Sequence, residues 1–109
     1  MTEKRVRPTK KNGLPAKRPE ITDHQFSLIS KALAEPRRYE ILAEIGRRDC
    51  ATPCTCLAES QPISPATLSH HMKELAKAGL IRIERQGKYA NITLQRDVLR
   101  AYLDRLASL

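Results

Sequence analysis

The sequence predicts a mainly α-helical domain that carries one small antiparallel β-hairpin near its C-terminal end. Three observations support this fold class. Apolar residues recur at helical spacing in several segments between residues 22 and 106. The pattern changes to strict alternation on either side of Gln86-Gly87, as expected for a hairpin with glycine in its turn. The 109 residues contain no Trp and one Phe, so the core must be built from Leu, Ile and Ala.

The charge distribution divides the chain into an arm and one domain. Residues 1–20 carry seven Lys and Arg against two acidic residues, with three Pro and almost nothing apolar. This composition predicts a disordered basic N-terminal arm, which either contacts phosphates or is simply solvated. Residues 21–109 carry thirteen basic against ten acidic residues, and their length suits a single folded domain.

Two helices are expected at the start of the domain. Thr22 and Gln25 have the spacing of a capping box, which predicts that the first helix begins there. Its apolar stripe is formed by Phe26, Ile29 and Leu33, widened by Leu28 and Ala32. Pro36 ends this helix and can open the next, because a helix tolerates proline in its first turn. The second helix buries Ile41, Leu42 and Ile45 and is expected to end near Gly46.

A short helix over about residues 53–60 precedes a longer one over residues 64–77. Ser64 supplies a cap and Pro65 a first-turn proline for the longer helix. Its inward stripe is formed by Leu68, Met72 and Leu75, and His71 lies beside that stripe. Its outward positions are polar or basic: Thr67, Ser69, His70, Lys73 and Lys77.

The hairpin and a closing helix complete the expected order. Ile81 and Ile83 alternate with polar residues before the turn, as do Ile92 and Leu94 after it. Arg82, Arg85 and Lys88 are expected near the hairpin tip. The closing helix has a broad apolar stripe formed by Val98, Leu99, Tyr102, Leu103 and Leu106.

This order of elements suits binding to DNA. The net charge of +8 and a pI near 9.8 favour a polyanionic partner. A helix anchored by one face can place its N-terminal residues in the major groove, where short side chains such as Thr67 and Ser69 reach base edges. Lys73, Arg85 and Lys88 would then contact phosphates. A solvated basic face, or a module that binds an acidic protein, is the alternative, and salt dependence of duplex binding distinguishes them.

Three segments carry a resemblance to a known family. "KALAEPRRYEIL" at 31–42, "ISPATLSHHMKELAKAGLI" at 63–81 and "ERQGKYANITL" at 84–94 resemble the second helix, recognition helix and wing of the ArsR/SmtB repressors. The resemblance implies a dimeric winged helix-turn-helix regulator, most often a repressor, with an operator of two related half-sites. It implies that Thr67, Ser69, His70 and His71 lie at the DNA-facing positions. Ser64, at the start of the same helix, is also expected to contact DNA. His70 departs from the Arg common at its position, which leaves the operator sequence open.

The resemblance also implies a homodimer that pairs the first and last helices. The two apolar stripes of those helices provide an independent reason, because together they exceed what short helices in one chain can cover. The alternative is that each stripe only completes the internal core.

Cys50, Cys54 and Cys56 form a cluster with soft thiolate ligands. Three thiolates could hold arsenite, antimonite or another thiophilic metal, although side chains at i and i+2 of a regular helix diverge. "PCTCLAE" is similar to the Cys-x-Cys of the family's arsenical sensors, but Leu57 replaces their acidic residue. The alternatives are sensing of thiol oxidation or persulfides, and no ligand at all. No cofactor is otherwise required.

An enzyme and a membrane protein are both disfavoured. The sequence has no Cys-x-x-Cys and no Gly-rich phosphate loop, and His70 and His71 diverge by about 100° on a helix. No apolar run approaches the roughly 20 residues of a membrane span, and no secretory signal is visible. An odd number of Cys without an export signal predicts reduced thiols and a cytoplasmic protein.

Overall fold

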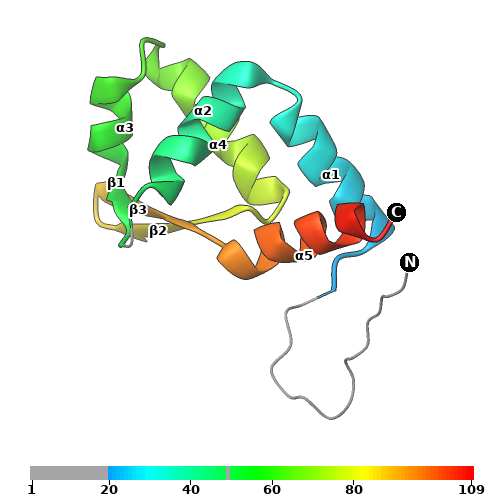
Figure 1. Cartoon of the computed structure of the whole chain (residues 1–109). Coiled ribbons are helices and arrows are strands. Elements are labelled where there is room, and N and C mark those ends of the chain that lie inside the picture. The colour runs from blue at the N-terminus through cyan, green and yellow to red at the C-terminus, as the bar shows by residue number, and fades with distance from the viewer. Residues whose placement is uncertain (1–19, 49) are drawn as a thin grey trace.

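The computed structural model describes residues 20–48 and 50–109, so most of the arm expected over residues 1–20 lies outside the described residues. Within these ranges the chain forms five helices and a three-stranded antiparallel sheet (Figure 1). None of the described helices is long and apolar enough to cross a membrane. The helices are α1 Asp23–Leu33, α2 Pro36–Gly46, α3 Cys54–Ser60, α4 Pro65–Lys77 and α5 Arg96–Ala107, and the strands are β1 Thr52–Pro53, β2 Ile81–Gln86 and β3 Tyr89–Leu94.

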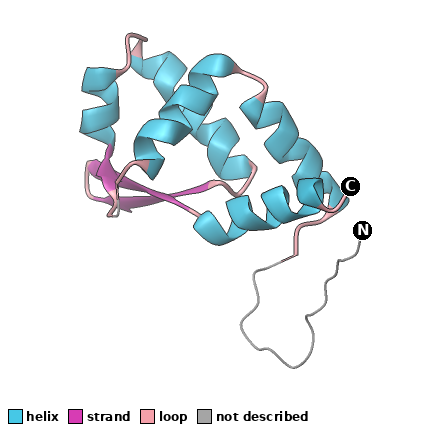
Figure 2. Cartoon of the chain, in the orientation of Figure 1, coloured by secondary structure: helices cyan, strands magenta, loops and turns pink. Residues whose placement is uncertain are grey.

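The expected helices and hairpin are confirmed, and the structure adds one strand. In the sheet order β1-β3-β2, β3 lies between its two partners. Helices α1–α4 lie on one side of this small sheet, whereas α5 extends beyond the end of β3 (Figure 2). The hairpin register pairs Ile81 with Leu94 and Ile83 with Ile92. Gly87 has a φ of +63° in the turn, as the alternating pattern predicted. The added strand β1 has two residues and pairs Thr52 with Ile92.

The core lies where α1, α2, α4 and the sheet meet. The fully buried side chains of the core come from both the helices and the sheet, and they include Leu57 on α3. As predicted, Pro36 occupies the first turn of α2, and the inner face of that helix is buried. The largest buried side chains are Ile29, Ile41, Ile45, Leu57, Leu75, Leu80 and Ile92. Burial of such aliphatic side chains stabilises a domain by about 1.5–3 kcal/mol each.

The start of α1 forms only half of the expected capping box. Thr22 caps the helix by accepting a hydrogen bond from the backbone N–H of Gln25 at 3.0 Å. The side chain of Gln25 does not return that bond. Its Nε2 instead donates to the carbonyl of Ala78 at 3.2 Å, just after α4. Gln25 therefore ties the first helix to the end of α4, where Gly79 has a φ of +84°.

Helices α1 and α5 pack against each other. The rings of Phe26 and Tyr102 lie 5.1 Å apart between centroids, and the Tyr102 hydroxyl and Ser30 Oγ are 3.0 Å apart. Arg105 covers the Phe26 ring at 4.3 Å and pairs with Asp23 at 2.7 Å. Part of each apolar stripe is thus used inside the chain.

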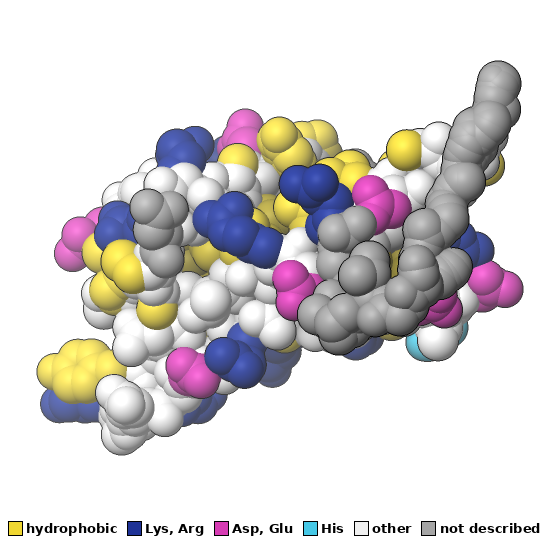
Figure 3. Space-filling view, turned by 60° about the horizontal axis from the view of Figure 1, so that its bottom comes forward, with side chains coloured by type: hydrophobic (Ala, Val, Ile, Leu, Met, Phe, Trp, Pro, Cys, Tyr) yellow, Lys and Arg dark blue, Asp and Glu magenta, His cyan; other side chains and the backbone are white. Residues whose placement is uncertain are grey.

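The outer side of α5 nevertheless remains apolar. Leu103 and Leu106 are 48% and 39% exposed, and Leu109 just beyond the helix is fully exposed. Figure 3 brings forward the face that Figure 1 draws at the bottom, and it shows hydrophobic side chains exposed among Lys and Arg side chains. Leucines at these positions leave apolar surface available for another protein surface.

Candidate nucleic-acid interface

Helix α4 begins at a cap made by its own first residues. Ser64 has an extended backbone, and its Oγ accepts from the backbone N–H of Thr67 at 3.1 Å. The same hydroxyl donates to Thr67 Oγ1 at 2.9 Å. Pro65 follows in the first turn, as expected. The proton of Ser64 is therefore used inside the cap, whereas the proton of the Thr67 hydroxyl is free to donate outward.

The two faces of α4 differ sharply in burial. Leu68, Met72 and Leu75 are buried and fix the helix to the rest of the domain. The opposite face exposes hydroxyl, imidazole and ammonium groups from the first three turns. Its exposed predicted residues are Thr67, Ser69, His70 and Lys73. Lys77, further along, pairs with Glu74 at 3.4 Å. The outer face of α4 thus offers short polar groups on a fixed support.

His71 does not belong to this exposed face. It is only 8% exposed, and with Leu68 and Leu75 it completes the buried stripe at positions i, i+3 and i+7. Its Nδ1 accepts a hydrogen bond from Nε of Arg38 on α2 at 3.2 Å. Burial, together with the nearby Arg38 guanidinium, lowers the pKa of His71 from its ordinary value. The side chain therefore points away from any DNA that the outer face of α4 would contact.

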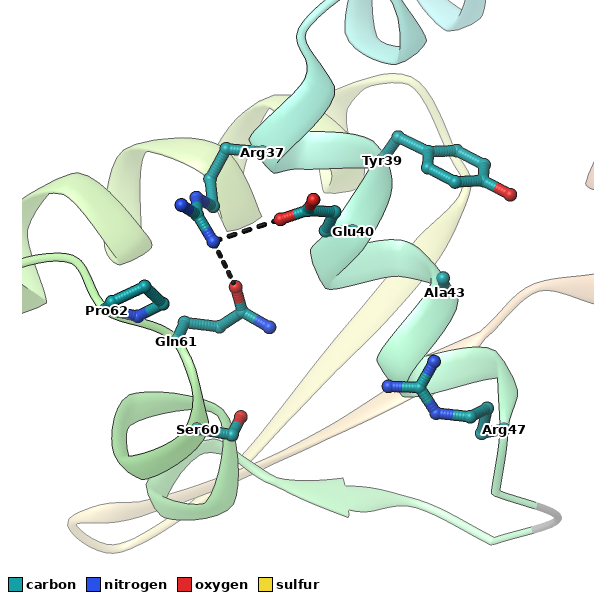
Figure 4. Close-up of a pocket in the computed structure, with 8 residues that line it drawn as sticks. All are labelled: Arg37, Tyr39, Glu40, Ala43, Arg47, Ser60, Gln61 and Pro62. Atoms are coloured by element: carbon teal, nitrogen blue, oxygen red, sulfur yellow. Dashed lines mark hydrogen bonds and ion pairs between the residues drawn. The ribbon is translucent and has the colours of Figure 1, made fainter.

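A polar cluster holds the turn between α3 and α4 against α2. Arg37 donates to Glu40 at 3.0 Å and to the side-chain oxygen of Gln61 at 3.2 Å (Figure 4). Glu44 accepts from Ser60 Oγ at 2.6–2.7 Å and from Gln61 Nε2 at 2.7 Å. An open pocket of about 450 Å³ lies beside this cluster. These bonds anchor the segment that leads into α4.

The β2–β3 hairpin carries the remaining predicted contacts. Arg85 and Lys88 are exposed on either side of the turn. Arg82 lies nearer the body of the sheet and pairs with Glu84 at 3.6 Å. Strand β2 packs on α4, so the hairpin extends from the same support. Tyr89 at the tip is 64% exposed and was not among the residues predicted for the site. One feature of the sequence could have indicated it, namely its position next to Lys88 beside the turn.

The three cysteines are free thiols, but they do not form a ready ligand group. Cys50 is exposed, and Cys54 and Cys56 are half-buried in the first turn of α3. Among the described residues, no cluster of three His, Cys, Asp or Glu side chains is arranged to hold a metal ion. The thiolates suit a thiophilic ligand chemically. Their arrangement would have to change to enclose one.

Comparison with known proteins identifies the domain type. The helix-turn-helix domain family matches residues 33–84, which run from the end of α1 into β2. The arsenical resistance operon repressor of Staphylococcus xylosus is 39% identical over 64 residues, covering 58% of this chain and 59% of that protein. A LexA repressor from Polaromonas naphthalenivorans (strain CJ2) is 36% identical over 97 residues, covering 83% of this chain and 35% of that protein. The chain therefore spans less than two thirds of the length of these curated relatives.

Solved structures share the fold over most of the chain. The crystal structure of an ArsR family transcriptional regulator matches with a TM-score of 0.72 at 23% identity, covering 83% of this chain and 91% of that one. A homodimeric winged helix-turn-helix DNA-binding domain from Mycobacterium bovis, described as a possible ArsR-family regulator, matches with a TM-score of 0.63 at 24% identity. That match covers 78% of this chain and 79% of the other. At these identities the likeness establishes the fold.

The chain therefore contains a helix-turn-helix domain and shares the winged helix-turn-helix fold of the ArsR-family structures named above. In this fold, α3 and α4 form the helix-turn-helix and the β2–β3 hairpin is the wing. The relatives named above are repressors or transcriptional regulators by name. The structure places the predicted polar residues of α4 on its outer face, with His71 as the exception. Arg38, which holds His71, was not singled out by the sequence pattern.

Proposed function

We propose that this protein is a sequence-specific DNA-binding transcriptional regulator of the ArsR family, acting as a repressor. The observation that carries this proposal is the division of α4 into a buried apolar face and an exposed face bearing Thr67, Ser69 and His70. The hydroxyls can donate to or accept from base edges, and their short reach requires the helix to enter the major groove closely. A helix anchored by three core side chains can hold that position.

The wing and α4 supply the cations for the backbone. Lys73 on the outer face of α4, with Arg85 and Lys88 at the hairpin tip, would bind phosphates and set the register of the helix without reading sequence. Ser64 contributes by capping α4, because its hydroxyl is already engaged with Thr67. Exposed Tyr89 lies beside Lys88 and would contact the sugar-phosphate surface with it.

The functional unit in this proposal is a homodimer on two related half-sites. Leu103 and Leu106 leave the outer side of α5 apolar, and α1 lies directly against that helix. Pairing of α1 and α5 with their copies would cover this surface. The Mycobacterium bovis domain, which shares the fold, is named as homodimeric. Two-fold symmetry in the protein requires two-fold symmetry in its operator.

The cysteines make thiol chemistry the best candidate for regulation. Cys54 and Cys56 lie in the first turn of α3, the helix that leads through residues 61–64 into α4. We propose that a thiophilic species such as arsenite, on binding both thiols, distorts this turn and weakens DNA binding. The name of the Staphylococcus xylosus relative supports this class of effector. A DNA-binding regulator would work in the cytoplasm, where thiols are kept reduced and available.

Salt dependence of DNA binding tests the proposed function. With Lys73, Arg85 and Lys88 each binding one phosphate, a dimer makes six contacts, so log Kd should rise with log salt with a slope of about 5. Removing Arg85 and Lys88 in both protomers should lower the slope to about 2. Arg47→Ala/Arg48→Ala removes the same charge at the end of α2 and should leave the slope unchanged. A shallow slope for the wild type, with binding to an acidic polypeptide instead, would identify a protein-interaction module.

A further inference from the structure

The contact between Arg38 and His71 joins α2 to the centre of α4. The Arg38 Nε donates to His71 Nδ1 at 3.2 Å, and its Nη1 reaches the carbonyl of Ala32 at 3.5 Å. Arg38 therefore bridges the end of α1 and the inner face of α4. The preceding residue, His70, is exposed. The centroids of the His70 and His71 rings lie 5.8 Å apart. The side chain of His71 faces the core, and that of His70 faces the side proposed to contact DNA.

The hydrogen bond requires one particular form of His71. Because Nδ1 accepts from a guanidinium, the ring must be neutral with its proton on Nε2. A proton on Nδ1 would remove the acceptor and place a cation against Arg38. The charged and titratable groups that act on His71 are Arg38 and Arg37 on α2, Glu35 at the cap of α2, and His70 on α4 itself. Two arginines against one glutamate favour the neutral ring.

We propose that Arg38 is a positioning residue for DNA recognition: by holding the neutral ring of His71 against α2, it fixes the rotation at which α4 presents Thr67, Ser69 and His70. This inference rests on the proposed function of α4. Leu68, Met72 and Leu75 hold the helix down, but such contacts are not directional and tolerate small rotations. A hydrogen bond to a planar ring is directional. Base readout needs side chains held to within about 10–20° of the productive orientation.

Variants of the pair separate this role from simple stabilisation. Arg38→Met removes the donor and a charge, and Arg47→Met, at the C-cap of α2, is the control for loss of one positive charge. His71→Asn keeps an acceptor close to the position of Nδ1 but does not titrate. Binding is measured by fluorescence anisotropy on a duplex selected from a random-sequence pool and on a scrambled duplex of equal length. The ratio of the two Kd values reports recognition, and the scrambled Kd reports backbone binding.

The expected results distinguish the variants. Arg38→Met should lower the ratio of the scrambled Kd to the selected Kd about tenfold, because it leaves a buried acceptor unsatisfied and α4 free to rotate. Arg47→Met should leave the ratio unchanged, and His71→Asn should stay within about threefold of the wild type. As pH falls below about 6.5, selected-duplex affinity should fall more in the wild type than in His71→Asn. His70 is present in both proteins, so the comparison reports the change made at residue 71.

Imidazole ¹H–¹⁵N NMR provides a readout that does not need DNA. The proposal expects the neutral Nε2–H form of His71 in the wild type at pH 7.5. A proton on Nδ1 in the wild type would overturn it, as would an unchanged duplex ratio in a folded Arg38→Met protein. If Arg38→Met does not fold, equal pH profiles for the wild type and His71→Asn would overturn it. A wild type that does not prefer the selected duplex would instead refute the proposed function of α4.

Discussion

Gly79→Ala tests how the end of α4 is fixed to α1. Gly79 has a φ of +84°, and an added Cβ would lie 2.5 Å from Nε2 of Gln25. That amide would have to rotate away and would lose its bond to the carbonyl of Ala78, which measures 3.2 Å. Gly87 supplies a matched control, because it also has a positive φ, of +63°, but a Cβ there would have nothing within 4 Å.

The two substitutions should differ by the value of one hydrogen bond. Alanine in the left-handed region costs about 1 kcal/mol at either site. At Gly79 the lost hydrogen bond adds about 1 kcal/mol, for a total near 2 kcal/mol. The entropy that alanine removes from the unfolded chain is the same in both variants and cancels. We therefore expect Gly79→Ala to lower the free energy of unfolding by about twice as much as Gly87→Ala.

Urea unfolding followed by circular dichroism measures these differences, with the chain concentration held constant because the stability of the proposed dimer would depend on it. A double-mutant cycle with Gln25→Ala identifies the cause. In that background Gly79→Ala should cost only about 1 kcal/mol, like Gly87→Ala, which gives a coupling energy near 1 kcal/mol. Equal costs for Gly79→Ala in both backgrounds would refute the assignment of Gln25 as the link between α1 and α4.

Three further predictions concern stability, regulation and assembly. Because the pKa of His71 in the folded protein lies below 6.5, the unfolded chain binds more protons. Urea unfolding at several pH values should therefore show the free energy of unfolding falling as pH drops below about 6.5. An equal fall in the wild type and in His71→Asn would contradict this prediction. Arsenite should release DNA from the wild type but not from Cys54→Ser/Cys56→Ser, and equal responses would exclude the thiols. Light scattering should report about twice the 12.3 kDa chain mass, and Leu103→Glu/Leu106→Glu should halve it; a monomeric wild type would exclude the α5 interface.

Local signals in the sequence predicted most elements of the fold. Ser64 followed by Pro65 predicted the start of α4, and the structure places the cap and the proline there. Gly87 predicted the hairpin turn. Strand β1 could not be predicted, because two residues carry no periodicity and the strand exists only through its pairing with β3, some 40 residues away in the chain.

The candidate site was predictable where exposure followed helical spacing. Thr67, Ser69 and His70 lie on the outer face of α4, as their positions between the apolar residues indicated. For His71 the family resemblance and the spacing disagreed, and the spacing was right, since His71 lies three residues after Leu68. Its partner Arg38 comes from 33 residues earlier and becomes its neighbour only through the packing of α2 on α4.

The most direct test of the account replaces Ser69 and His70 with alanine together. The Kd is measured for a duplex selected from random sequences and for its scrambled counterpart, with Arg47→Ala/Arg48→Ala on exposed positions after α2 as control. We expect the double variant of α4 to keep its fold and its affinity for scrambled DNA but to bind both duplexes alike, while the control retains the wild-type preference. If the Ser69→Ala/His70→Ala protein still discriminates as the wild type does, then the outer face of α4 does not read DNA sequence.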